Sequence, residues 1–290
     1  MQTVPLILSR MESIAARRNP VSAAPVGGLL REWRAARRLS QLDLALAAGI
    51  SSRHLSYVET GKARASRETV AKLADTLEMP LRERNALLLA AGYAPEYPET
   101  GLATPEMTQM RRAIELILAQ QEPYPAFLIN RQWEVLSANM GAECVNRFML
   151  GGRASAHTNM MRQFFDPDDL RAAVANWEEV ACEMIRHLHD YVAATPTDRA
   201  AKSLLEEALA RPGVPARWRL RDLSAMPSPL LTTVLRRDGV ELRFFSTITT
   251  FAAPRDITLD ELYIECCFPM DEETARHCRE LANQERSCEG

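Results

Sequence analysis

The sequence predicts two folded parts: an all-α N-terminal domain of five short helices, and an α+β C-terminal domain built on an antiparallel sheet. Apolar residues recur at helical spacing through residues 26–92, separated by capping serines and closing glycines. Three prolines and two glycines between Gly92 and Pro105 are typical of a linker, placed at 93–104. Alternating apolar segments then appear among longer helical ones in 105–290. Residues 1–25 show no periodicity and are expected to form a flexible leader.

Each predicted helix of the first domain has an apolar face and its own end signals. Ser40 and Ser51 are expected to cap the second and third helices, which Gly49 and Gly61 would end in a left-handed conformation. The first helix should end near Arg38, and the last two span Arg67–Leu77 and Leu81–Ala91. The residues expected to face the core are, helix by helix, Leu29, Leu30, Trp33 and Ala36; Leu42, Leu44, Ala45 and Ala48; Leu55 and Val58; Val70, Leu73 and Leu77; and Leu87 and Leu88.

The second domain is predicted to contain five strands interrupted by helices. Asp238-Gly239 is typical of the type I′ turn of a hairpin, Asp166-Pro167 of a helix start, and Asp271 of a helix cap. In chain order, the predicted elements are a helix over Pro105–Gln121, strands Ala126–Ile129 and Trp133–Ala138 joined at Asn130-Arg131, a long helix from Pro167 to about Ala194, a hairpin of Leu230–Arg236 and Val240–Thr250, a strand over Leu262–Phe268, and a C-terminal helix.

Composition narrows the class of protein. The chain is 47% hydrophobic and 25% charged, which is ordinary for a soluble globular protein. No apolar run approaches the roughly 18 residues that cross a bilayer, and Val4–Leu8 is too short for a signal peptide. We therefore expect a cytoplasmic protein without a membrane partner. Its six cysteines should be thiols, and without a C-x-x-C pair they predict no metal site.

The charge is unevenly distributed along the chain. Residues 26–92 carry 11 Lys or Arg against 7 Asp or Glu, whereas 93–290 carry 21 against 30. A basic module joined to an acidic one indicates that only the first meets a polyanion.

The stretch Leu39–Lys62 combines features that a DNA-reading helix pair needs. Ala45 is small where two helices would cross, Gly49 makes the turn between them, and Ile50 packs beneath it. The second helix of the pair would then turn its polar side chains outward, where they can bond to base edges or phosphates. These side chains are Ser52, Arg53, Ser56 and Tyr57.

This segment, with its pattern S-Q-x-x-L-A-x-x-A-G-I-S…L-S-x-x-E-x-G, resembles the helix-turn-helix of the lambda-repressor-like, or XRE, family over residues 28 to about 90. The resemblance implies a double-stranded DNA partner. It implies phosphate contacts by Gln41 and Ser51, base reading by Ser52, Arg53 and Tyr57, backbone contacts by Lys62 and Arg64, and a structural ion pair of Arg34 with Glu59. Alternatives remain: Arg53 could bind phosphate, Tyr57 could pack on the sugar-phosphate backbone, and the whole domain could bind a protein.

Five segments of the second domain, in order, resemble the ligand-binding domain of MmyB-like regulators. They are Tyr124–Asn139, Asn176–Val180, Pro212–Pro215, Glu241–Thr247 and Thr258–Leu262. The resemblance implies a PAS-like sheet with helices over one face, and an elongated apolar ligand such as a fatty acid.

The residues are compatible with such a ligand. A cation would meet the head group of a carboxylic acid, with Arg162 the first candidate and Arg243 the second. The apolar candidates are Phe127, Trp133, Phe148, Phe164, Phe165, Trp177, Leu188, Phe244 and Phe245. The alternatives are that these side chains simply fill a core and that both arginines are solvated.

The sequence thus predicts a ligand-responsive transcription regulator, binding a two-fold operator as a homodimer. No catalytic motif or residue is found, so no enzyme and no cofactor are expected. Glu183, His187 and Asp190 share a helix face, but a solvated face explains them better than a metal site. The rival hypotheses are a DNA-binding scaffold with a protein partner and an autoregulating enzyme.

Overall fold

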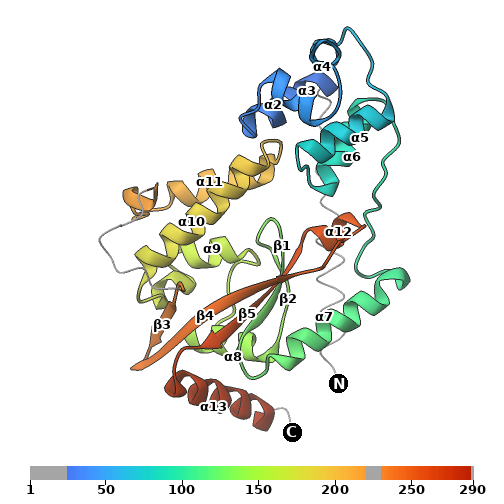
Figure 1. Ribbon diagram of the computed structural model, residues 1–290. Helices are drawn as coiled ribbons and strands as arrows, with labels where there is room; N and C mark the ends of the chain where they lie inside the picture. The colour runs from blue at the N-terminus through green and yellow to red at the C-terminus, as the bar shows by residue number, and fades with distance from the viewer. Residues whose placement is uncertain (1–24, 220–229, 289–290) are drawn as a thin grey trace.

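A computed structural model describes residues 25–219 and 230–288 of the chain. Within these residues five helices precede an α+β part with a five-stranded antiparallel sheet, as predicted (Figure 1). The predicted leader lies almost wholly in residues 1–24, outside the described residues.

The N-terminal helices begin and end where their capping residues predict. Ser40 and Ser51 each accept a hydrogen bond from the backbone N–H three residues ahead. Gly49 (φ 66°) and Gly61 (φ 74°) adopt the left-handed conformation that ends a helix. The five helices are α2 (Val26–Ala36), α3 (Gln41–Ala47), α4 (Ser52–Glu59), α5 (Arg67–Thr76) and α6 (Leu81–Ala90).

One apolar core joins these five helices, centred on Trp33, Leu44 and Leu55, which are fully buried. The prediction that Leu42 faces this core is wrong, because Leu42 is 65% exposed. Leu42 and Leu44 lie about 200° apart around a helix, so both cannot face the same side. Leu44 takes the inward position.

The sheet has strand order β2-β1-β5-β4-β3, and every neighbouring pair is antiparallel. Both residues of the Asp238-Gly239 turn have positive φ, 49° and 79°, which confirms the predicted type I′ class. The strands are β1 (Ala126–Asn130), β2 (Val135–Ala138), β3 (Thr233–Arg237), β4 (Val240–Thr250) and β5 (Leu262–Pro269).

Helices cover both faces of the sheet (Figure 1), so the expectation of helices over one face alone is wrong. Ile114 and Leu118 of α7 pack on one face, whereas Ala142 of α8 and Met160 of α9 pack on the other. The helical elements of this part are η1 (Pro105–Met107), α7 (Thr108–Gln120), α8 (Met140–Met149), α9 (Met160–Phe165), η2 (Leu170–Ala173), α10 (Trp177–Ala194), α11 (Arg199–Ala210), η3 (Ala216–Arg219), α12 (Ile257–Asp260) and α13 (Glu272–Cys288). In the described ranges, no helix is both long and apolar enough to cross a bilayer.

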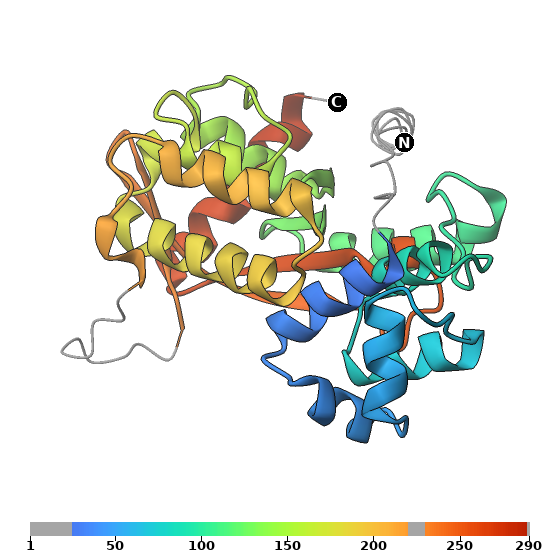
Figure 2. The same cartoon turned by 90° about the horizontal axis from the view of Figure 1, so that it is seen from above.

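The prediction of one long helix from Pro167 is wrong, because η2 and α10 are separate. Val174 forms an isolated β-bridge with Leu235, and the N–H of Ala175 donates to the carbonyl of Val234. This tertiary pairing draws the chain into an extended conformation between the two helices. Figure 2 shows α10 beside α11 over the sheet.

The predicted strand at Trp133 begins only at Val135, because a longer turn follows β1. The side-chain oxygen of Asn130 accepts hydrogen bonds from the backbone N–H groups of Gln132 and Glu134. Trp133 itself has φ 64°, a conformation outside the strand region. The hairpin strand predicted from Leu230 likewise begins at Thr233.

The segment joining the two parts is fastened at both ends. The side chain of Asn85 bonds the backbone of Glu96 and Tyr97. Farther along, the N–H of Thr100 donates to Asp256, and Leu102 is buried beside α7. The helices of 26–90 are thereby held against one end of the sheet.

Candidate DNA-binding surface and ligand-binding interior

The turn between α3 and α4 brings the two helices together as the sequence predicts. Ala45 is 1% exposed, and its carbonyl accepts a hydrogen bond from the N–H of Ile50 across the turn. Leu55 and Val58 anchor the inner side of α4 in the core. Because these contacts fix the rotation of α4, the opposite side of the helix faces outward.

That outward side of α4 carries the predicted DNA-contacting residues. Ser52 and Arg53 are exposed, Tyr57 is 36% exposed, and Ser56 is half-buried. The guanidinium of Arg53 lies over the ring of Tyr57, 5.4 Å from its centroid, which limits the positions of both side chains. The oxygen of Ser51 accepts the cap bond, so its hydroxyl hydrogen is left to donate.

A buried carboxylate organises the start of α3. Arg34 and Glu59 form the predicted ion pair through two hydrogen bonds of 2.8 and 3.1 Å, and the Glu59 side chain is fully buried. Hydrogen bonding to Glu59 raises the pKa of Arg34, which keeps the guanidinium charged. The amide of Gln41 also donates to Glu59 at 2.7 Å, which leaves its second N–H for another acceptor.

Two further predicted contacts follow α4. Lys62 and Arg64 are both exposed. Arg64 lies over the ring of Tyr93, 5.4 Å from its centroid, and so is partly positioned by the segment after α6.

The predicted ligand-contacting side chains gather between the sheet and the helices opposite α7. They occupy three neighbouring clusters, and Phe164 and Met184 belong to all three. Phe127 lies in the cluster on β1, Phe148, Trp177 and Phe244 in the cluster on β4, and Trp133, Phe165 and Leu188 in the cluster of α9, α10 and α11. Phe245 instead stacks on Phe268, toward the face that α7 covers, so it lies apart from the rest.

Each of the two candidate arginines is paired with a carboxylate of the protein. Arg162 makes three hydrogen bonds to Glu207, the shortest 2.9 Å, and its side chain is 42% exposed. Arg243 pairs with Glu241 and lines an open surface depression of about 490 Å³ that also includes Asp271. Arg162 is therefore at the edge of the apolar clusters, whereas Arg243 lies outside them.

A row of polar side chains on the sheet was not predicted from the sequence. Alternate residues of β5 point to opposite faces, so Tyr263, Glu265 and Cys267 share the face of Phe127. Burial raises the pKa of Glu265, and a hydrogen bond from Ser246 partly offsets this effect. The period-2 pattern of Leu262–Pro269 could have placed Glu265 there.

On the helix face that carries Glu183, His187 and Asp190, the side chains contact protein groups. The His187 ring meets the Trp133 ring edge-on at 5.5 Å, and Glu183 pairs with Arg186. Across residues 25–219 and 230–288, no His, Cys, Asp and Glu side chains gather as a metal site would require.

Family models match both parts of the chain. A model described as MmyB-like transcription regulator ligand binding domain matches residues 110–281, and a helix-turn-helix domain model matches residues 25–87. The first match begins within α7 and ends within α13, and the second begins just before α2 and ends within α6.

A curated relative matches over a shorter stretch. It is an uncharacterized HTH-type transcriptional regulator, RghRB, of Bacillus subtilis (strain 168), 40% identical over 77 residues. The match covers 26% of this chain and 53% of the relative, so the chain spans about half the length of that protein.

Proposed function

The chain belongs to the family of transcription regulators with an MmyB-like ligand-binding domain, and we propose that it regulates transcription by binding duplex DNA in response to a small apolar ligand. The observation that carries the DNA-binding half is the outward face of α4, where Ser52, Arg53 and Tyr57 stand together on a helix anchored by Leu55 and Val58. Such a helix fits the major groove, with its side chains at base edges.

The operator is proposed to be two-fold symmetric and bound by a homodimer. Helix-turn-helix proteins gain specificity by placing two recognition helices one turn of DNA apart. A ligand changes the affinity only if it binds one arrangement of the paired domains more tightly than the other. The proposed mechanism is therefore a shift in the population of arrangements.

The ligand is proposed to be a fatty acid or a similar lipid held in the clusters around Phe164. Side chains shared by three clusters make this interior continuous, as an elongated chain requires. Burying each methylene contributes roughly 0.8 kcal/mol, so a dozen carbons suffice without a head-group contact. Arg162 would orient the carboxylate, which must then compete with Glu207.

Native mass spectrometry of the full chain tests the ligand first, because a bound lipid adds its own mass. A fluorescent acyl probe then measures uptake, with circular dichroism as the check on folding. We expect Trp177→Asp or Phe244→Asp to abolish uptake, and Arg162→Met to weaken acids more than the matching alcohols. A folded wild-type chain that neither carries lipid nor binds the probe would reject the lipid ligand.

A further inference from the structure

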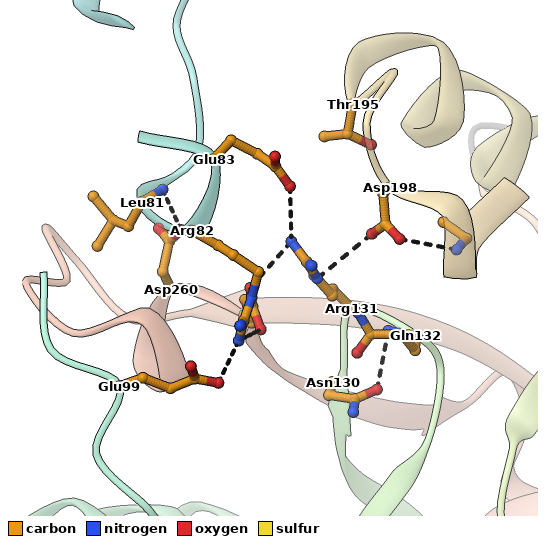
Figure 3. Close-up of polar contacts among 12 residues, drawn as sticks. Leu81, Arg82, Glu83, Glu99, Asn130, Arg131, Gln132, Thr195, Asp198 and Asp260 are labelled. Carbon is orange, nitrogen blue, oxygen red and sulfur yellow. Dashed lines mark hydrogen bonds and ion pairs between the residues drawn. The ribbon is translucent and has the colours of Figure 1, made fainter. Parts of the chain in front are cut away.

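A buried ionic network joins the helix-turn-helix domain to the sheet domain (Figure 3). At its centre the Arg131 side chain is only 6% exposed and faces three carboxylates. Its charged nitrogens lie 3.1 Å from Glu261, 3.5 Å from Asp198 and 3.8 Å from Glu83. Among the described residues, its Nε and Nη1 atoms have no hydrogen-bond partner, so these contacts are ion pairs alone.

The first turn of α6 provides the other side of the network. Arg82 bonds Glu261 and Glu99, each at 2.6 Å, and the N–H of Leu81 donates to Asp260. Glu83 accepts a hydrogen bond from Thr197 in the turn between α10 and α11. Three separate parts of the sheet domain therefore hold one helical turn: the β1–β2 turn, the α10–α11 turn and α12.

The network adds little net stability, but it is sensitive to the loss or displacement of one of its members. Burial raises the pKa of Glu83, against the lowering effects of Thr197 and Arg131. Four carboxylates share two arginines, namely Glu83, Glu99, Asp198 and Glu261 with Arg82 and Arg131. Buried pairs of this kind gain little net free energy because desolvation offsets their attraction, yet removing one partner is costly. A small displacement of Arg131 would therefore alter the contact with α6.

The turn that carries Arg131 also reaches the apolar interior. Trp133, two residues farther on, packs in the clusters of α9, α10 and β1, and its ring meets His187 of α10. The end of α10 touches the other domain as well, because Arg37 donates to the carbonyl of Ala194. A change around Trp133 is thus connected to α6 through the β1–β2 turn, and to the end of α2 through α10.

We propose that the β1–β2 turn is the connection between the apolar interior and the helix-turn-helix domain, with Trp133 as its inner contact and the Arg131–Glu83 pair as its outer one. This proposal rests on the proposed function, because the signal that the turn would transmit is ligand binding, which would act through Trp133. Arg131 and Trp133 are positioning residues, and their effect on DNA is exerted through α6.

Hydrogen exchange of the full chain, followed by mass spectrometry, tests the outer contact without DNA or ligand. We expect Arg131→Met to speed exchange of the backbone N–H groups at 81–85 by about tenfold, as local opening becomes easier. Glu83→Gln should act similarly, and the double variant should add little to either, since both remove one interaction. Arg147→Met is the matched control, because its exposed pair with Glu285 joins α8 to α13.

The inner contact is tested by Trp133→Ala against Trp177→Ala, which removes a similar side chain from the same interior away from the turn. We expect only Trp133→Ala to speed exchange at 81–85. Equal acceleration by both variants, or none by Arg131→Met, would overturn the proposal. Lipid and DNA binding are measured separately. If the chain binds neither but still shows this exchange pattern, the proposed function is wrong and the proposed connection still holds.

Discussion

At the scale of single residues, one buried carboxylate determines how the DNA-binding helices are presented. Glu59 closes α4 onto α2 through Arg34 and holds the first side chain of α3 through Gln41. The resemblance predicted the Arg34 pair, but sequence alone could not show that Gln41 shares the same acceptor. The Gln41 side chain is therefore held by a hydrogen bond to Glu59, whereas the Arg53 guanidinium lies over the Tyr57 ring.

Arg53→Ala and Gln41→Ala should weaken DNA binding in different ways. Loss of a base contact should lower discrimination between a selected duplex and random DNA by about 1–3 kcal/mol for Arg53→Ala. Loss of a phosphate contact should weaken binding to both duplexes alike for Gln41→Ala. Titrations of each variant on both duplexes measure this, and equal losses on both for Arg53→Ala would reassign it to phosphate.

Gly27→Ala should destabilise the N-terminal domain. A methyl group on Gly27 would overlap the backbone carbonyl of Glu59, where α2 and α4 approach closely. Overpacking of this kind costs about 1–3 kcal/mol, measured as the free energy of unfolding in urea. Gly28→Ala is the control: in residues 25–219 and 230–288 nothing lies within 4 Å of the added carbon, so helix propensity should raise stability by about 0.5–1 kcal/mol. Equal effects of the two changes would contradict the close approach.

At the scale of elements, the sequence correctly predicted the helix ends and turns that are determined by residues close together in the chain. Caps and closing glycines placed α3 and α4, and the Asp238-Gly239 pair placed the β3–β4 hairpin. The errors lie where a distant partner decides. Val174 leaves the helix because Leu235 pairs with it from more than fifty residues away, and no local pattern contains that information.

The packing of α13 on α8 and β4 makes a chemical prediction at Cys278. Its side chain is buried, and burial raises the pKa of the thiol to about 12. Native Cys278 should therefore resist alkylation by iodoacetamide at pH 8, and urea should make it reactive, as peptide mass spectrometry would show. The fold favours the protonated thiol. The contribution of Cys278 to the free energy of unfolding should therefore fall as the pH rises above 9.0, the ordinary pKa of a cysteine thiol. Rapid native alkylation would contradict the packing.

At the scale of the whole molecule, the sequence predicted the two parts and the residues on α4, but not how the parts meet. The network around Arg131 draws on α6, the β1–β2 turn, the α10–α11 turn and α12. Each member is an ordinary charged residue in its own segment, so only the folded chain shows that they converge. The apolar candidates were predicted as a group, whereas the partner of Arg162, Glu207, was not.

The affinity of the full chain for duplex DNA, measured with and without a twelve-carbon fatty acid, tests the central claim most directly. The duplex is selected from random sequence, and the protein is first freed of bound lipid. Coupling between the two sites predicts a change in affinity of at least about fivefold, in either direction, and a much smaller change for Arg131→Met. An unchanged affinity, with the acid shown by native mass spectrometry to be bound, would contradict the account.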